Sequence, residues 1–129
     1  MTEELISFST AKLAKEKGLP VFEYMGWKTK FYHPRTKNMF AYGRTGRVDI
    51  NTMYYAPTQS LLQKWLREKY KIHLRITQCF FHNLDTMGFQ VETEYMGIGN
   101  KPKYDTHHAP FKTYEEALEA GLIEALKLI

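Results

Sequence analysis

The stretch APTQSLLQKWLREKYKIHLRI, residues 56–76, changes its hydrophobic period halfway along. Its first part repeats apolar residues three and four positions apart, at Leu61, Leu62, Trp65 and Leu66. This spacing predicts an amphipathic helix over 57–70 with Pro57 at its first position, where no N–H is needed. From Ile72 onward apolar and polar residues alternate, which is typical of a β-strand. The stretch therefore predicts a helix that leads directly into a strand.

The alternating pattern continues into a second strand and predicts a β-hairpin. Residues 72–82 and 87–97 form the two strands, and a four-residue loop over 83–86 joins them. The best register pairs Leu74 with Tyr95, Ile76 with Thr93, Phe80 with Phe89 and Arg75 with Glu94. Apolar residues then meet apolar residues and opposite charges meet, as cross-strand pairs prefer.

Both ends of the chain predict helices. An N-terminal helix over about 8–17 can be capped by Ser7 or Ser9, and Gly18 suits its C-terminal end. At the other end TYEE, residues 113–116, has the spacing of a capping box. A stripe of apolar residues follows it, at Tyr114, Leu118, Leu122, Ala125, Leu126 and Ile129.

Two segments are harder to interpret. Aromatic residues on both sides of HPRTKN, residues 33–38, predict a loose hairpin with strands near 21–32 and 38–43. The glycines, asparagine and prolines of residues 97–110 predict a loop. Taken together, the pattern predicts a single α+β domain over 1–129, an antiparallel sheet covered by about three helices.

Composition limits the class of protein. Hydrophobic residues make up 43% and charged residues 25% of the 129-residue chain, as in ordinary globular domains. No apolar run approaches the length of a membrane span, and the first residues lack the positive charge of a secretory signal. Cys79 is the one cysteine, so no internal disulfide can form, and we expect a buried, inert thiol in a reducing cytoplasm.

Three segments of the chain together resemble a known family. They are ISFSTAKLAKEKG (6–18), APTQSLLQKWLREKYKIH (56–73) and KTYEEALEAGLIEALKLI (112–129). In this order they resemble a family of small proteins encoded by phages and prophages of gut bacteria. The resemblance implies a mobile-element protein that works in the cytoplasm of a bacterial host. It implies no activity and carries over no catalytic or cofactor-binding residue.

Enzymatic chemistry finds no support in the sequence. The five histidines, His33, His73, His82, His107 and His108, lack metal-ligand spacing. There is no nucleophile motif and no phosphate-binding loop. Glu92 and Glu94 could form a carboxylate pair, although a solvated sheet face beside Arg75 explains them better. We therefore expect no enzyme, no catalytic residue, no cofactor and no metal site.

The charge distribution favours an anionic partner. Residues 28–75 hold eleven basic and two acidic side chains, a net charge of +9, whereas residues 84–129 have a net charge of −4. Nine aromatic residues also lie between Phe22 and Tyr55. Cations neutralise phosphates and exposed rings stack on bases, so the pattern predicts binding of nucleic acid without sequence preference. The candidate residues are Lys28, Lys30, Arg35, Lys37, Arg44, Arg47, Lys64, Arg67 and Lys71.

Three other interpretations of this pattern remain open. The aromatic residues can form a core with the cations as its solvated rim, or the two oppositely charged halves can pack against each other. The third is a protein-interaction module that binds a host or phage protein, because interfaces favour tyrosine, tryptophan, methionine and arginine. The sequence fixes neither the strand order nor the oligomeric state.

Overall fold

The computed structural model describes residues 4–20, 30–41, 52–81, 84–97, 99 and 101–129. Within these residues the chain has three helices and two antiparallel three-stranded sheets, so the predicted α+β class is confirmed. The prediction had a single sheet. The chain divides into two compact units, residues 1–58 and 59–129, and each sheet belongs to one of them.

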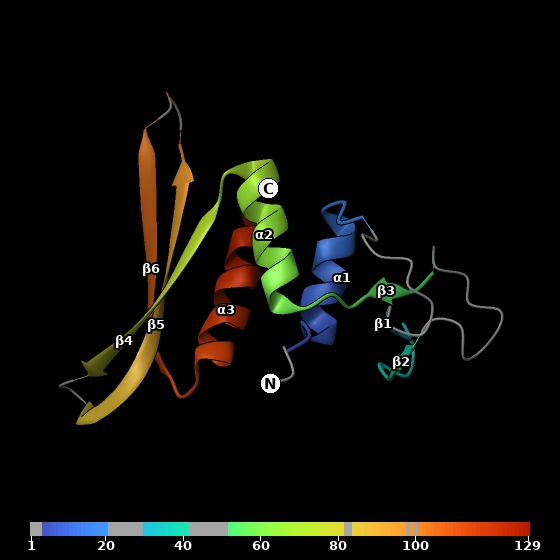
Figure 1. Ribbon diagram of the computed structural model, residues 1–129, viewed down its shortest axis with the longest axis horizontal. Coiled ribbons are helices and arrows are strands. Elements are labelled where there is room, and N and C mark those ends of the chain that lie inside the picture. The colour runs from blue at the N-terminus through green and yellow to red at the C-terminus, as the bar shows by residue number, and fades with distance from the viewer. Residues whose placement is uncertain (1–3, 21–29, 42–51, 82–83, 98, 100) are drawn as a thin grey trace. The chain divides into compact units, whose positions relative to one another are not determined.

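Unit 1 combines one helix with a small sheet (Figure 1). Helix α1 (Phe8–Glu16) begins at Ser7, whose Oγ accepts the Thr10 N–H at 3.3 Å. Gly18 follows the helix with φ +90°, a conformation that favours glycine. The predicted first helix is therefore confirmed, with Ser7 as its cap.

The sheet of unit 1 consists of β1 (Lys30–Tyr32), β2 (Met39–Ala41) and β3 (Tyr54–Tyr55), in the order β2-β1-β3. Strands β1 and β2 form an antiparallel hairpin across residues 33–38, which confirms the described part of the predicted one. The predicted strand residues 21–29 and 42–43 lie outside the described residues. Strand β3 was not predicted, and it pairs with the other edge of β1.

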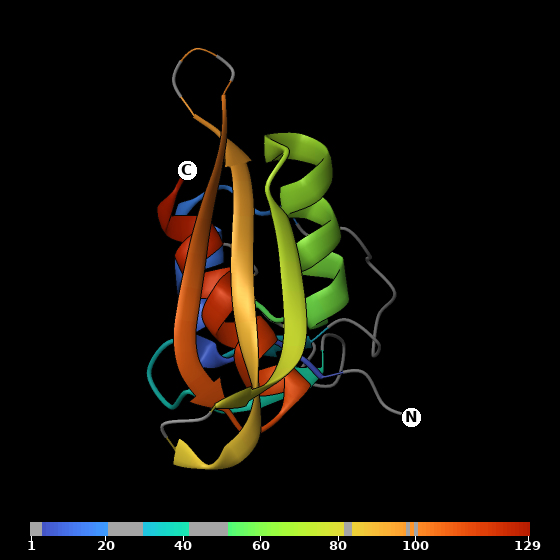
Figure 2. The same cartoon turned by 90° about the vertical axis from the view of Figure 1, so that its left-hand side faces the viewer.

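Unit 2 is a sheet with two helices on one face (Figures 1 and 2). Its elements are α2 (Gln59–Tyr70), β4 (His73–Phe81), β5 (Thr86–Met96), β6 (Pro102–Phe111) and α3 (Tyr114–Lys127). Strand β5 is central and pairs antiparallel with both neighbours. The core includes Leu62, Leu66, Val91, Leu122 and Leu126, all of which are fully buried.

Helix α2 begins later than predicted. Thr58 forms an isolated antiparallel bridge with Leu5, and the Pro57 carbonyl accepts the Ile6 N–H at 3.0 Å. Pro57 therefore lies in an extended segment that pairs with residues 5–6, and the helix starts at Gln59. The predicted position of Pro57 within the helix is wrong because a tertiary strand contact takes precedence over the local preference.

The predicted register of the β4–β5 hairpin is wrong by two residues. Leu74 pairs with Thr93, Ile76 with Val91, Phe80 with Met87 and Arg75 with Glu92. Phe81 and Thr86 form the last pair, so the four-residue loop is 82–85 and lies one position earlier than predicted. Asp85 adopts φ +49°, which aspartate tolerates better than most residues. A shift of two residues keeps every side chain on its predicted face.

The predicted loop over 97–110 is wrong for most of its length, because residues from Pro102 onward form strand β6. Pro102 is the first residue of an edge strand, and the register of β5 with β6 shifts between Phe89 and Val91, opposite the part that contains Pro110. Both features allow proline in a strand. Tyr95 also donates a hydrogen bond to Asp105 across this pair, which raises the pKa of the tyrosine hydroxyl.

Helix α3 packs very closely on the sheet at Gly121. A Cβ placed there would lie 2.5 Å from Val91 Cγ2, so only glycine fits without movement. The Thr113 half of the predicted capping box is present, since Thr113 Oγ1 accepts the Glu116 N–H at 3.1 Å. The Glu116 carboxylate accepts the N–H of Lys112, also at 3.1 Å, one residue before the cap.

Candidate nucleic-acid interface

The turn between β1 and β2 is the most basic exposed element described in unit 1. We call residues 33–38 the basic turn. Lys30 precedes it on β1, and Arg35 and Lys37 lie within it, all with exposed side chains. The N–H of His33 donates to the Asn38 carbonyl and the N–H of Lys37 donates to the His33 carbonyl, both at 2.9 Å. These bonds close the turn and direct its middle toward solvent.

Side chains complete the hydrogen bonding of the basic turn. His33 Nδ1 accepts the N–H groups of Arg35 and Thr36, both at 3.2 Å. Thr36 Oγ1 in turn accepts the Asn38 N–H at 3.3 Å. Pro34 has no N–H, so each main-chain donor from residue 33 to residue 38 has an acceptor. The turn is therefore a defined structure although its side chains are exposed.

Lys37 is held in an unusual conformation. Its φ is +62°, in the left-handed region that glycine and asparagine adopt more readily. Its ammonium lies 5.5 Å from the centroid of the Phe8 ring, within cation–π range. The contact links the basic turn to the start of α1.

The described aromatic residues of unit 1 are packed and do not form an exposed stacking platform. Phe31 is fully buried and Tyr55 is 9% exposed. Phe8 meets Tyr32 and Tyr54 edge to face, with ring centroids 5.8 and 5.4 Å apart. The Tyr32 hydroxyl donates to the Ile6 carbonyl at 2.6 Å. For these residues the interpretation as a core with a cationic rim fits the structure.

Three candidate residues lie in unit 2, at and beyond α2. Lys64 and Arg67 are exposed on the helix. Lys64 lies 4.0 Å from Glu68 in a solvent-exposed ion pair, which contributes little to stability. Lys71 follows the end of the helix with φ +58°, so it does not continue the helical row that the sequence predicted.

The candidate residues therefore fall into three groups. Lys30, Arg35 and Lys37 lie together on the β1–β2 hairpin, and Lys64, Arg67 and Lys71 lie in unit 2. Lys28, Arg44 and Arg47 lie outside the described residues. Convergence of all nine on one surface stays a prediction.

Charge is divided unequally between the two units. Residues 1–58 contain nine basic and five acidic side chains, and residues 59–129 contain nine of each. Unit 1 therefore holds the whole net charge of +4, and unit 2 is neutral. Unit 1 also contains cations that the sequence analysis did not include, of which Lys12 on α1 is exposed. The lysine-rich run AKLAKEKG, residues 11–18, could have indicated these additional cations.

On the outer face of the unit 2 sheet one arginine pairs with two glutamates. Arg75 lies 3.4 Å from a Glu92 oxygen and 4.0 Å from a Glu94 oxygen. The two carboxylates thus share one guanidinium, which fits the interpretation as a solvated sheet face. Cys79 is half-buried on β4 and was expected to be buried. The described residues contain no group of three or more side chains that could hold a metal ion.

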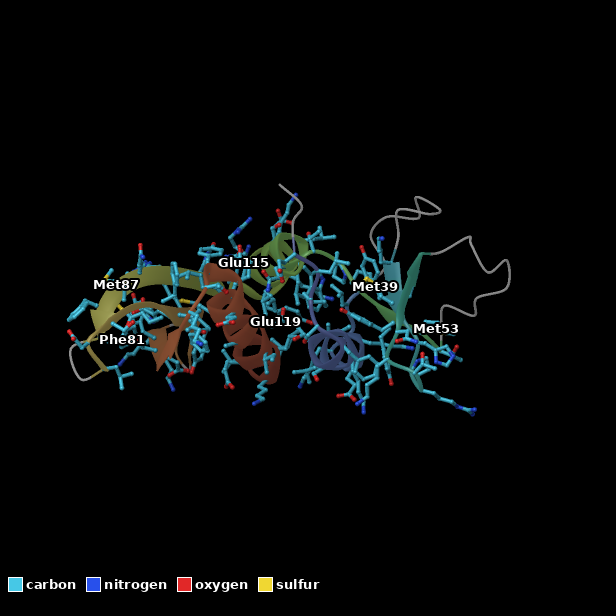
Figure 3. The ribbon with its side chains drawn as sticks, turned by 90° about the horizontal axis from the view of Figure 1, so that it is seen from below. Met39, Met53, Phe81, Met87, Glu115 and Glu119 are labelled. Carbon is cyan, nitrogen blue, oxygen red and sulfur yellow. The ribbon has the colours of Figure 1, made fainter. Side chains whose placement is uncertain are left out.

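The tip of the β4–β5 hairpin exposes several large apolar side chains. Phe80 is 42%, Leu84 59% and Met87 55% exposed. Figure 3 labels Phe81 and Met87 at this end of the sheet, where Phe80 pairs with Met87 and Phe81 pairs with Thr86. Asp85 is the one charged residue between positions 80 and 87. We call residues 80, 81, 84 and 87 the apolar tip.

Comparison with protein-family models, with curated proteins and with solved structures finds no match for this chain. Among the described residues no helix is long and apolar enough to cross a membrane.

Proposed function

We propose that the protein binds single-stranded nucleic acid without sequence preference and without catalysis, mainly through the basic turn of unit 1. The observation that supports this is the location of the whole +4 net charge in unit 1, with Arg35 and Lys37 exposed on a hydrogen-bonded turn. Neither residue has a carboxylate in ion-pair contact among the described residues. Cations without anionic partners are the groups that displace counterions from phosphates.

Binding in this way depends on phosphate contacts more than on base stacking, because the described rings of unit 1 are packed. Binding of this kind depends steeply on salt, since each phosphate that is neutralised releases a counterion. We further propose that the protein is encoded by a phage or prophage and acts inside the bacterial host cell.

The test is a fluorescence-anisotropy titration with labelled single-stranded DNA and RNA at low salt. Affinity should fall with rising salt with a slope of roughly 0.7 per phosphate contacted. A triple variant, Lys30→Glu with Arg35→Glu and Lys37→Glu, should abolish binding while circular dichroism shows the fold to be intact. The absence of binding at about 100 μM wild-type protein, where typical non-specific contacts are detectable, would overturn the proposal.

The matched control reverses the three cations of unit 2 (Lys64→Glu, Arg67→Glu and Lys71→Glu). This variant has the same change in net charge at a different place. A weaker effect than that of the unit 1 variant assigns binding to the basic turn. Equal loss in both variants indicates that the two sets of cations act on one nucleic-acid strand.

The apolar tip favours a second candidate function, binding to a protein partner. Aromatic residues and methionine are enriched in protein interfaces, and the tip has a single charge. A partner that suits it has an apolar groove, and the complex should persist at high salt. Leu84→Ser with Met87→Ser should then remove the partner, whereas charge reversals in the basic turn should not.

A further inference from the structure

The basic turn depends on the protonation state of one side chain. His33 Nδ1 accepts two main-chain N–H groups, from Arg35 and Thr36. A neutral imidazole has one acceptor nitrogen, whereas both nitrogens of the protonated ring are donors. Both bonds therefore require His33 to be neutral with its proton on Nε2. No other acceptor serves these two N–H groups among the described residues.

We propose that neutral His33 is a positioning residue that holds the basic turn in its phosphate-binding shape, and that protonation of Nδ1 releases the turn. The binding part of this inference rests on the proposed function, whereas the change in the turn does not. A released turn must be ordered again when it binds, at a cost in conformational entropy. Nucleic-acid affinity should therefore fall as His33 becomes protonated.

The charged groups around His33 do not stabilise its protonated form. Arg35 and Lys37 flank it in the turn, and strands β2 and β3 contain no charged residue. On α1 the charged residues are Lys12, Lys15 and Glu16, and Glu16 lies eight residues, about 12 Å of helix, beyond Phe8. Neither Glu16 nor the preceding Glu4 forms an ion pair with the imidazole. A proton on His33 thus gains no carboxylate partner among the described residues and adds a third positive charge to the turn.

Charge and shape predict opposite effects on binding, which makes the inference testable. If His33 acted only through its charge, protonation would tighten the contact with phosphate. If it positions the turn, protonation weakens that contact. His33→Asn is the matched variant, because the asparagine side-chain oxygen can accept the same main-chain N–H groups and does not titrate in this range. His33→Ala removes the acceptor at every pH.

The first measurement follows the turn itself by ¹⁵N relaxation of the full chain at two pH values, one at which the ring ¹⁵N shifts show His33 to be neutral and one at which they show it to be protonated. In the wild type the order parameters of the Arg35 and Thr36 N–H groups should fall from about 0.85 to below about 0.6 as the His33 ring becomes protonated. They should remain high in His33→Asn and be low throughout in His33→Ala. High values in the wild type with a protonated ring would overturn the inference.

The second measurement is the affinity for oligo-dT at constant ionic strength, because thymine does not protonate in this range. Wild-type affinity should fall on the order of tenfold between the two pH values, the size expected for the loss of two neutral hydrogen bonds. His33→Asn should show no such fall. Tighter wild-type binding at low pH would overturn the positioning role. The absence of oligo-dT binding at both pH values would refute the proposed function, and the relaxation experiment would still decide the state of the turn.

Discussion

The side-chain amide of Gln59 donates to Glu119 Oε1 and to the main-chain carbonyl of Glu115, both at 3.0 Å. Gln59 is the first residue of α2 and is 5% exposed, and both acceptors belong to α3, on which Figure 3 labels the two glutamates. A buried amide with both protons satisfied thus fastens the start of one helix to the first half of the other.

Gln59→Ala should lower the free energy of unfolding by about 1–3 kcal/mol, because it removes two hydrogen bonds and leaves their acceptors without this donor. Urea denaturation measures the loss. Gln63→Ala is the control on the same helix, since Gln63 makes a single, longer bond of 3.4 Å to the Leu74 carbonyl. An equal loss in both variants would contradict the importance of the α2–α3 link.

Trp65→Ala should cost roughly 3–5 kcal/mol, as expected for removal of a large buried aromatic side chain. Trp65 lies on the apolar face of α2 and is 6% exposed, and its ring meets Tyr70 edge to face at 5.2 Å. Lys64→Ala, one residue earlier and exposed, should change stability by no more than about 0.5 kcal/mol. A loss below about 1 kcal/mol for the tryptophan variant would show that the side chain is not part of the core.

Lys71→Gly should stabilise the protein by up to about 1 kcal/mol, because Lys71 has φ +58° and glycine adopts this conformation without steric strain. The same substitution within the helix, Lys64→Gly, should instead destabilise it by about 1 kcal/mol. Thermal denaturation of the two variants measures both effects. Equal destabilisation by both would indicate that Lys71 is not strained in solution.

Thr93→Val should raise the free energy of unfolding by up to about 1 kcal/mol. The Thr93 hydroxyl is buried and has no hydrogen-bond partner among the described residues, so its replacement by a methyl group of similar shape removes a desolvation cost. Thr77→Val on the exposed face of β4 is the control and should be close to neutral. Destabilisation by Thr93→Val would indicate that the hydroxyl has a partner in solution.

Local signals predicted the elements that depend on neighbouring residues. The cap at Ser7, the glycine at position 18 and the cap at Thr113 each involve groups within four residues, and all three are present. The helical spacing of the leucines around Trp65 likewise identified the buried face of α2. In these cases both partners of the interaction lie within one short segment of the sequence.

The errors concern interactions with partners far along the chain. The β4–β5 register differs by two residues because two alternatives place the same residues on the same faces, and the position of the left-handed Asp85 distinguishes them. Strand β6 has a composition typical of a loop and is a strand because the free edge of β5 is beside it. Thr58 belongs to a bridge with Leu5, which no local pattern could indicate.

The candidate site could be predicted in part. The sequence identified Arg35 and Lys37 as candidate binding residues, but it gave no indication that His33 accepts two N–H groups within the same turn. Histidine is not among the residues usually associated with turn capping, so composition does not reveal this role. The packing of Tyr32 and Tyr54 against Phe8 likewise depends on a contact between distant segments.

The close approach of Gly121 to Val91 links two positions that are thirty residues apart in sequence. Alanine would suit the middle of a helix better than glycine by about 1 kcal/mol, but here its methyl group would meet the valine side chain. The side chains at positions 91 and 121 therefore compete for the same space between α3 and the sheet. A larger residue at one position requires a smaller residue at the other. Distant relatives that have lost overall similarity should still show this exchange, so the pair offers a two-residue signature for finding them.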